Sequence, residues 1–278
     1  MQKKYVKMLC RGKLLSTDKP LIMGILNITP NSFFDGGQYQ QKDAILKRVE
    51  QILKEGADIV DIGCMATNPQ AKELSEIEEL KIVEKVGNLL FPRYKDIVFS
   101  IDTYRSKVAE MAVNMGVAII NDISGGDFDA EMFDMVAKLH VPYILMHTSG
   151  KPQEMQQKTD YQNLIKDIML IFSKKIQVLR QLGVCDIIID PGFGFGKTIE
   201  QNYELMKNLS IFQTLQCPIL IGISRKSMIY QLLETAPADA LGGTIVLNTF
   251  ALLKGANILR VHDVRQAVET VKILSQLL

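Results

Sequence analysis

Polar and charged side chains follow most of the short apolar runs in this sequence of 278 residues. Carboxylate groups accept hydrogen bonds, amide groups both donate and accept, and lysine and arginine bind anions. The residues at these positions are Asn27, Gly63, Asp102, Asn121, Asp122, His147, Asp190, Ser224, Arg225, Lys226, Arg260 and His262. Brought together, they would form a binding site for a small polar ligand.

The apolar runs have the character of buried parallel strands. They are rich in Ile, Val and Leu and are mostly unbroken by polar alternation, a pattern typical of strands buried on both faces. The eight runs are Leu21–Leu26, Ala57–Ile62, Ile97–Ile101, Val117–Ile120, Val141–Met146, Asp186–Ile189, Cys217–Ile223 and Ala256–Val261.

Segments with helical periodicity separate these runs. One apolar stripe has the spacing i, i+3, i+4 and i+7 of a helix packed on a sheet, at Val108, Met111, Ala112 and Met115. Two helix starts have the pattern of a capping box, in which two side chains satisfy unpaired backbone donors. They are Ser75 with Glu78, and Thr198 with Gln201.

Eight strand–helix alternations in a chain of this length predict a single (β/α)8 TIM barrel. We expect one domain over residues 1–278, with the barrel proper over about 21–278 and a short N-terminal hairpin within Tyr5–Leu14 that closes its bottom. An open, doubly wound sheet is the alternative, but no GxGxxG follows the first strand. Because the carboxyl ends of barrel strands meet at one mouth, the polar residues there predict a site.

Composition narrows the class of partner. Hydrophobic residues make up 47% of the chain, which is enough to form a hydrophobic core. The net charge is only +1, and the basic stripe of a nucleic-acid binder is absent. A small-molecule partner is therefore expected. The four cysteines are far apart, and neither a signal peptide nor a membrane-spanning apolar stretch is present. These features predict a cytoplasmic protein with reduced thiols.

The segment from Asn27 to Gly37 is too long for a simple turn after a strand. Its Asn, Pro, Ser, Asp and Gly residues favour turns for local reasons, so a plain connector is one interpretation. Long loops at a barrel mouth are also where lids and ligand contacts concentrate, which favours a functional loop.

Seven motifs follow one another in order along residues 21–278. They are MGILNITP at 23–30 with Ser32-Phe33 and Asp35-Gly36-Gly37, SIDT at 100–103, INDI at 120–123, LMH at 145–147, DPGFGFGK at 190–197, SRKS at 224–227 and RVHD at 260–263. Each lies at the end of a predicted strand, which makes the set far more specific than any single tetrapeptide. Together they resemble the motifs of the dihydropteroate synthase family of pterin-binding TIM barrels.

This resemblance implies an enzyme of folate biosynthesis. Its reaction joins 6-hydroxymethyl-7,8-dihydropterin diphosphate to para-aminobenzoate through a new C–N bond and releases 7,8-dihydropteroate and diphosphate. The family also implies Mg2+ as cofactor, a homodimer formed through the outer helices, and a target of sulfonamides.

The resemblance places the pterin ring against Asp102, Asn121, Met146, Asp190, Lys226 and Arg260. Carboxylates suit the N–H groups of an aminopyrimidinone edge, and an amide suits both donors and acceptors. Catalytic roles are implied for Asp102, Asp190, Lys226, Arg260 and Asp35. A structural ion pair is the alternative for a buried Asp or Lys, because burying an unpaired charge is unfavourable.

The diphosphate is implied to lie against Asn27, Arg260 and His262, with Asn27 as the protein ligand of Mg2+. Arg260 and His262 would form a cationic pair for the leaving anion, and Arg260 would also stack on the pterin face. A satisfied structural histidine is the alternative for His262.

The aminobenzoate is implied to contact Thr67, Pro69, Phe195 and Ser227. The sequence departs from the family pattern in two loops, where Asn31 replaces an Asp and Asn68 replaces an Arg. Two other functions therefore stay open. One is a pterin-binding paralogue with altered or lost aminobenzoate activity. The other is a methyltransferase domain that binds methyltetrahydrofolate, which needs neither the long first loop nor the SRKS motif present here.

Overall fold

Eight parallel strands form a closed barrel in the computed structural model, which describes residues 6–28, 38–64 and 74–277. The strands are hydrogen-bonded in the order β8-β7-β6-β5-β4-β3-β10-β9. Between β9 and β8 the barrel closes through a bridge of Ile189 with Ile219, and the N–H of Ile189 donates to the carbonyl of Pro218 at 2.9 Å. The predicted (β/α)8 fold is confirmed.

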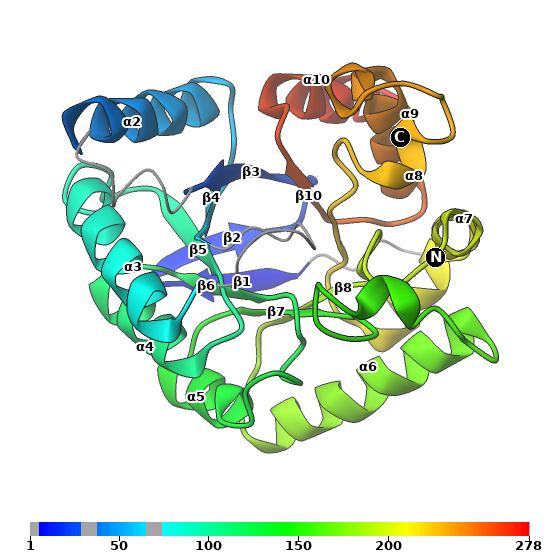
Figure 1. Cartoon of the computed structure of the whole chain (residues 1–278), viewed down its shortest axis with the longest axis horizontal. Coiled ribbons are helices and arrows are strands. Elements are labelled where there is room, and N and C mark those ends of the chain that lie inside the picture. The colour runs from blue at the N-terminus through cyan, green and yellow to red at the C-terminus, as the bar shows by residue number, and fades with distance from the viewer. Residues whose placement is uncertain (1–5, 29–37, 65–73, 278) are drawn as a thin grey trace.

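Helices surround the barrel as an outer ring (Figure 1). The barrel strands are β3 (Leu21–Asn27), β4 (Ile59–Gly63), β5 (Val98–Asp102), β6 (Ile119–Asp122), β7 (Tyr143–Met146), β8 (Ile187–Asp190), β9 (Leu220–Ile221) and β10 (Ile258–Val261). The helices are α2 (Gln38–Lys54), α3 (Glu76–Leu90), α4 (Ser106–Met115), α5 (Met132–Leu139), α6 (Leu164–Gln181), α7 (Ile199–Lys207), α8 (Ser227–Tyr230), α9 (Leu241–Leu253) and α10 (Val264–Leu274). In the described part of the chain, no helix has the length and apolarity needed to cross a bilayer.

Each of the eight predicted runs contains a strand, but the seventh is much shorter than expected. Only Leu220 and Ile221 of the run Cys217–Ile223 are in β9. Pro218 has no N–H to donate, so the ladder cannot extend regularly toward the start of the run.

Both faces of the barrel strands are buried, which explains their nearly unbroken apolar sequences. In β3, Leu21 and Met23 belong to the cluster inside the barrel, whereas Ile22 and Leu26 belong to the layer between strands and helices. Successive side chains of a strand point to opposite faces, so each strand contributes to both layers.

The N-terminal hairpin closes the bottom of the barrel, as predicted. It consists of β1 (Lys7–Cys10) and β2 (Lys13–Ser16), paired antiparallel. Arg11 and Gly12 connect them with φ of 48° and 80°, as a two-residue hairpin turn requires. Met8 and Cys10 are buried in the inner cluster with the first residues of the barrel strands.

The two predicted helix starts are confirmed, whereas the predicted apolar stripe differs from the buried face of its helix. Both capping boxes form, at the starts of α3 and α7. The predicted stripe of α4 is rotated, because Val108, Ala109 and Ala112 are buried whereas Met111 and Met115 are only half-buried. Small alanines let the helix pack closely on its neighbours, and the longer methionines lie at the edge of the contact.

Candidate active site

Arg260 lies at the centre of the polar groups inside the barrel mouth. From β10 its Nε donates to Oδ2 of Asp61 at 2.7 Å, and its Nη2 donates to Oδ2 of Asp102 at 2.7 Å. Asn121 on β6 donates from Nδ2 to the same oxygen of Asp61 at 3.1 Å. Three successive strands, β4, β5 and β6, and the last strand, β10, therefore hold one hydrogen-bonded network.

Asp61 is the residue that sequence reasoning missed. It lies inside β4, not at its end, and its side chain is fully buried. Its Oδ2 serves Arg260 and Asn121, while Oδ1 has no hydrogen-bond partner among the described residues. The signal in the sequence was an acidic residue in the middle of an apolar run, since a buried carboxylate is retained only where it has partners.

Asp190 and Lys226 form the other side of the mouth. Oδ1 of Asp190 accepts a hydrogen bond from the backbone N–H of Gly192 at 2.8 Å. Nζ of Lys226 donates to the carbonyl of Phe193 at 2.5 Å and lies 4.5 Å from the centre of the Phe195 ring. The last residue of β8 thus supplies the carboxylate, and the loop after β8 supplies the surface against which the lysine packs.

Burial shifts the pKa values of these groups toward neutrality. It raises the pKa of Asp102 to about 7, with Arg260 opposing the shift and Asp61 adding to it. Burial also raises the pKa of Asp190 against the effect of Lys226, and lowers the pKa of Lys226 to about 8. Arg260 differs from these groups. Burial lowers its pKa, but the negative charges of Asp61 and Asp102 have the larger effect and raise it. Perturbed pairs of this kind in a cavity are typical of functional sites.

Without a bound diphosphate, the surroundings of His262 favour the neutral imidazole, so the predicted cationic pair with Arg260 would need the anion to be present. Burial, followed by the charge of Arg260, lowers the pKa of His262 to about 4. Its Nδ1 lies 3.1 Å from Oγ of Ser224. Arg225 turns to Asp263, with which it makes two hydrogen bonds of 2.8 and 2.9 Å. Arg260 is therefore the cation that this strand end directs into the mouth.

Asn27 ends β3 with an exposed side chain. A Cβ placed on Gly63 of the next strand would lie 3.4 Å from Oδ1 of Asn27 and 3.7 Å from Oδ2 of Asp102. The glycine thus leaves open a space next to one side-chain oxygen of Asn27 and one of Asp102. Among the described residues, no group of three His, Cys, Asp or Glu side chains could hold a metal ion.

An apolar wall completes the mouth. Met146 is buried together with Tyr104 and Ile123, and Phe195 packs against this cluster. A flat ring can pack against such a surface. Ser227, the first residue of α8, is half-buried next to Lys226. The other predicted site residues, Asp35, Thr67 and Pro69, lie outside the described residues, as do Asn31 and Asn68.

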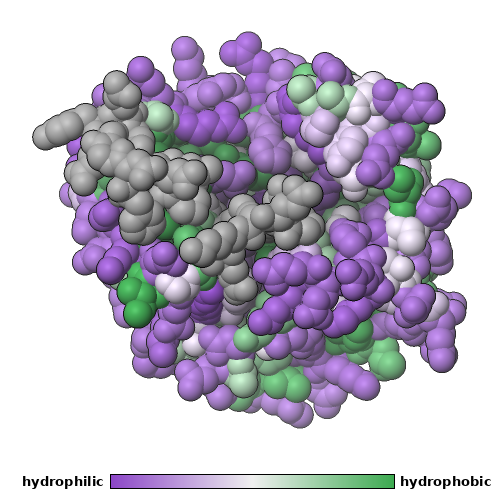
Figure 2. Space-filling view, in the orientation of Figure 1, coloured by the Kyte–Doolittle hydropathy of each residue, from purple (hydrophilic) through white to green (hydrophobic). Residues whose placement is uncertain are grey.

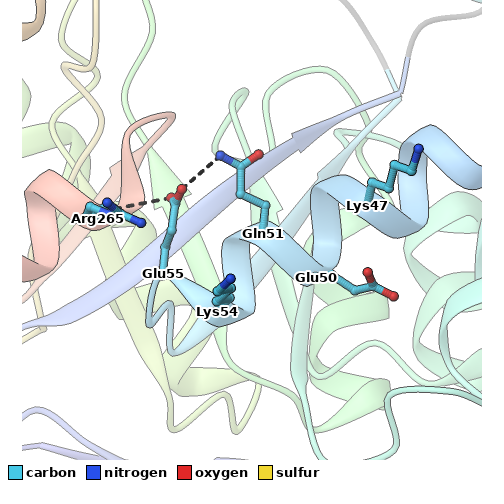
Figure 3. A pocket seen from close by; sticks show the side chains of 6 residues that line it. All are labelled: Lys47, Glu50, Gln51, Lys54, Glu55 and Arg265. Carbon is cyan, nitrogen blue, oxygen red and sulfur yellow. Dashed lines mark hydrogen bonds between the residues drawn. The ribbon is translucent and has the colours of Figure 1, made fainter.

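A second pocket, of about 350 Å³, lies on the outer surface between α2 and α10 (Figure 3). Two of its side chains, Gln51 and Glu55, form hydrogen bonds within the protein. Gln51 donates to Glu55 at 2.8 Å, and the other oxygen of Glu55 accepts from the backbone N–H of Arg265. This arrangement satisfies the start of α10, and we assign it no role in the chemistry.

Comparison with known proteins decides the family, since the model of the pterin binding enzymes matches residues 23–262. The chain belongs to the pterin binding enzyme family. It is 40% identical to the dihydropteroate synthase of Clostridium beijerinckii, over 92% of this chain and 93% of that protein. The family resemblance read from the motifs is thereby confirmed.

Solved structures of two pterin binding enzymes match the whole barrel. A structure of the Yersinia pestis dihydropteroate synthase with a sulfonamide drug complex has a TM-score of 0.90 and 37% identity, and covers 98% of both chains. The Xanthomonas albilineans dihydropteroate synthase with 4-aminobenzoic acid has a TM-score of 0.89 and 31% identity, over 99% of this chain and 98% of that one.

Proposed function

We propose that this chain is a transferase that catalyses the dihydropteroate synthase reaction. It condenses 6-hydroxymethyl-7,8-dihydropterin diphosphate with para-aminobenzoate and releases 7,8-dihydropteroate and diphosphate, as a step of folate biosynthesis. The observation that carries this proposal is the buried network of Asp61, Asp102, Asn121 and Arg260. Dihydropteroate synthases that align over nearly the full chain support it. They also favour it over the methyltransferase alternative.

The pterin lies between the two halves of the mouth. Asp102 and Asp190 accept hydrogen bonds from its N–H groups, Asn121 donates and accepts, and Lys226 donates to a ring acceptor. Met146 packs on the ring. Support comes from the burial of Asp102, Asn121, Asp190 and Met146, since a ligand held here leaves water and has its polar edge satisfied by the protein.

The chemistry needs no nucleophilic side chain. The aniline nitrogen of para-aminobenzoate attacks the methylene carbon of the pterin, the C–O bond to diphosphate breaks, and the nitrogen loses a proton to water or to the released diphosphate. Arg260 stabilises the leaving diphosphate, with His262 as a hydrogen-bond partner. The carboxylates of Asp102 and Asp190 stabilise positive charge that develops on the pterin, as preorganised electrostatic groups do in many enzymes.

Magnesium fits this site as an ion held mainly by the substrate. Asn27 supplies one amide oxygen, and Mg2+ usually binds through phosphates and few protein oxygens. When bound, Mg2+ would neutralise charge on the diphosphate. Asn27 orients that end of the substrate, next to the space above Gly63.

The aminobenzoate lies against Phe195 and Ser227, with Thr67 and Pro69 completing its contacts and Asp35 serving the reaction from the first loop. The structures of relatives with 4-aminobenzoic acid and with a sulfonamide drug support this assignment, and support sulfonamides as ligands of this site.

The active form is a homodimer that associates through α9. This helix carries no charged residue, and Val246, Phe250 and Leu253 are 65%, 37% and 55% exposed. In Figure 2, pale and green residues gather at the upper right, over the position of α8 to α10 in Figure 1. An exposed apolar patch favours a protein interface. A cytoplasmic location is also part of the proposal, and four free thiols suit a reducing compartment.

A condensation assay tests the proposed activity. Purified protein is mixed with the pterin diphosphate, para-aminobenzoate and Mg2+, and dihydropteroate and diphosphate are quantified. We expect equal amounts of both products, and loss of turnover with EDTA. Tight binding of the pterin without any product would instead indicate the silent paralogue. Unchanged turnover in EDTA would contradict only the proposed role of magnesium and would leave the proposed activity standing.

A further inference from the structure

The loop between β8 and α7 is wound around a buried lysine that none of the substrate contacts above uses. Lys197 is 4% exposed. Its Nζ donates to the carbonyl oxygens of Gly192 and Phe195 at 2.9 and 3.0 Å, and lies 3.1 Å from Nδ1 of His147. Three neutral acceptors thus match the three donors of an ammonium group.

Glycines allow this loop to wind so tightly. Gly192, Gly194 and Gly196 have φ of 73°, 77° and 61°, a region that residues with a Cβ rarely adopt. A Cβ on Gly192 would lie 1.9 Å from the carbonyl oxygen of His147, and one on Gly196 would lie 1.8 Å from Oγ of Ser149. The loop therefore packs directly against the end of β7, with Lys197 at its centre.

The same loop presents three groups to the mouth. The N–H of Gly192 holds the carboxylate of Asp190, while the carbonyl of Phe193 and the ring of Phe195 contact Nζ of Lys226. Gly192 is bound on one side by Lys197 through its carbonyl and on the other by Asp190 through its N–H. A change in the winding of the loop would move the carboxylate and the lysine together.

The charges in this region define the direction of the hydrogen bonds. Burial lowers the pKa of Lys197 to about 7, with Asp190 opposing the shift and Lys226 adding to it. Burial, and then Lys197 and Lys175, hold the pKa of His147 well below its ordinary value. At pH 6 the imidazole is therefore neutral and Lys197 is mostly an ammonium. Because an ammonium cannot accept, Nδ1 of His147 is the acceptor and the ring proton is on Nε2.

We propose that Lys197 is a positioning residue for the reaction. Its ammonium group holds the loop of residues 191–198 in shape, and the loop places Asp190 and Lys226 around the pterin. This inference rests on the proposed function, because it assigns Lys197 an effect on turnover through residues that bind the substrate.

Matched variants separate positioning from stability. Lys197→Met keeps a chain of similar length and removes every donor, whereas Thr198→Ala removes the neighbouring cap of α7 and leaves the three contacts of Lys197 intact. We expect both variants to lower Tm, but only Lys197→Met to lower kcat/KM for the pterin diphosphate by about tenfold or more, since small misplacements of reacting groups are costly. Lys197→Gln, with two donors, should lie between. A folded Lys197→Met protein with the kcat/KM of the wild type would overturn the proposal.

A measurement on the wild type keeps the proposal testable even where a variant does not fold. The chain has three histidines, so a ¹⁵N spectrum of their rings can be assigned with His147→Gln. At pH 6 we expect His147 to carry its proton on Nε2, with Nδ1 hydrogen-bonded. A proton on Nδ1 would exclude donation by Lys197 to His147, and with it the three-donor ammonium group that the proposal requires. The condensation assay on the wild type tests the proposed function separately.

Discussion

At the scale of single residues, the site depends on how buried charges compensate one another. Asp61 holds Arg260 in place, but as a second negative charge it also raises the pKa of Asp102. The arrangement therefore couples the geometry of the arginine to the protonation of the carboxylate that faces the substrate. Removing one partner of such a buried pair usually destabilises a protein by more than the intact pair stabilises it, because one charge is left buried without a partner.

Asp61→Asn tests this coupling. If Asp102 must be ionised to accept hydrogen bonds from the pterin, kcat/KM rises with pH through the pKa of Asp102. Removing the negative charge of Asp61 lowers that pKa, so the rising limb should move to lower pH. Asparagine keeps an oxygen for Arg260, which preserves the geometry. A full pH profile of both proteins is the measurement, and an unmoved midpoint would mean that Asp102 does not control the limb.

Lys226→Ala is expected to abolish condensation while the protein stays folded. The residue lies at the barrel mouth, where function is concentrated, and its loss removes the cation that opposes the raised pKa of Asp190. We expect kcat/KM to fall about 100-fold or more, roughly 2.7 kcal/mol of transition-state stabilisation. Lys138→Ala, an exposed lysine on α5, is the matched control. Near-wild-type turnover in Lys226→Ala would remove this lysine from the site.

At the scale of elements, local signals at helix ends set where each helix begins. Ser75 accepts from the N–H of Glu78, whose carboxylate accepts in return from the backbone N–H of Ser75 at 2.8 Å. This box starts α3 directly after the loop that precedes it. The buried apolar residues of the helix then belong to the apolar layer between strands and helices, and α3 packs against α4.

Ser75→Ala should lower the free energy of unfolding by about 1 kcal/mol, because an N-cap hydrogen bond is lost. Glu78→Gln is the matched control, since glutamine can still complete the box and should cost less. Urea denaturation monitored by circular dichroism measures both. Equal destabilisation by the two variants would contradict the expectation that the cap hydrogen bond of Ser75 outweighs the charge of Glu78.

At the scale of the whole molecule, the outer ring of helices exposes a row of apolar side chains on α9, a helix without charged residues. Helices on a barrel are expected to be apolar only toward the strands, but α9 exposes Val246, Phe250 and Leu253. Val246 and Phe250 are four residues apart and Leu253 is three further on, so they share one face of the helix.

A charge on this face should separate the proposed dimer. Phe250→Glu is expected to convert the protein from dimer to monomer in light scattering after size-exclusion chromatography, because a buried unpaired carboxylate is unfavourable. Leu170→Glu, at an exposed leucine of α6, is the control and should leave the mass unchanged. A monomeric wild type, or a Phe250→Glu protein that stays dimeric, would contradict the interface on α9.

Much of the barrel was predictable because its signals are local. A strand buried on both faces is mostly apolar, so the run Ile97–Ile101, which contains most of β5, is recognisable without its neighbours. Both capping boxes depend on residues three positions apart. The parallel order of strands then directs every carboxyl end to one mouth, and Asp102, Asn121, Asp190, Lys226 and Arg260 do lie there.

Only the tertiary structure decided how these groups pair. Asp61 is separated from Arg260 by most of the chain, so their contact depends on closure of the barrel and not on any local pattern. The same holds for Lys197 with His147, and for the neutral state of His262, whose pKa depends on burial and on Arg260. Sequence reveals which groups are available and at which strand ends they lie. Distance and burial, which arise only when distant strands meet, determine the partners and charges of those groups.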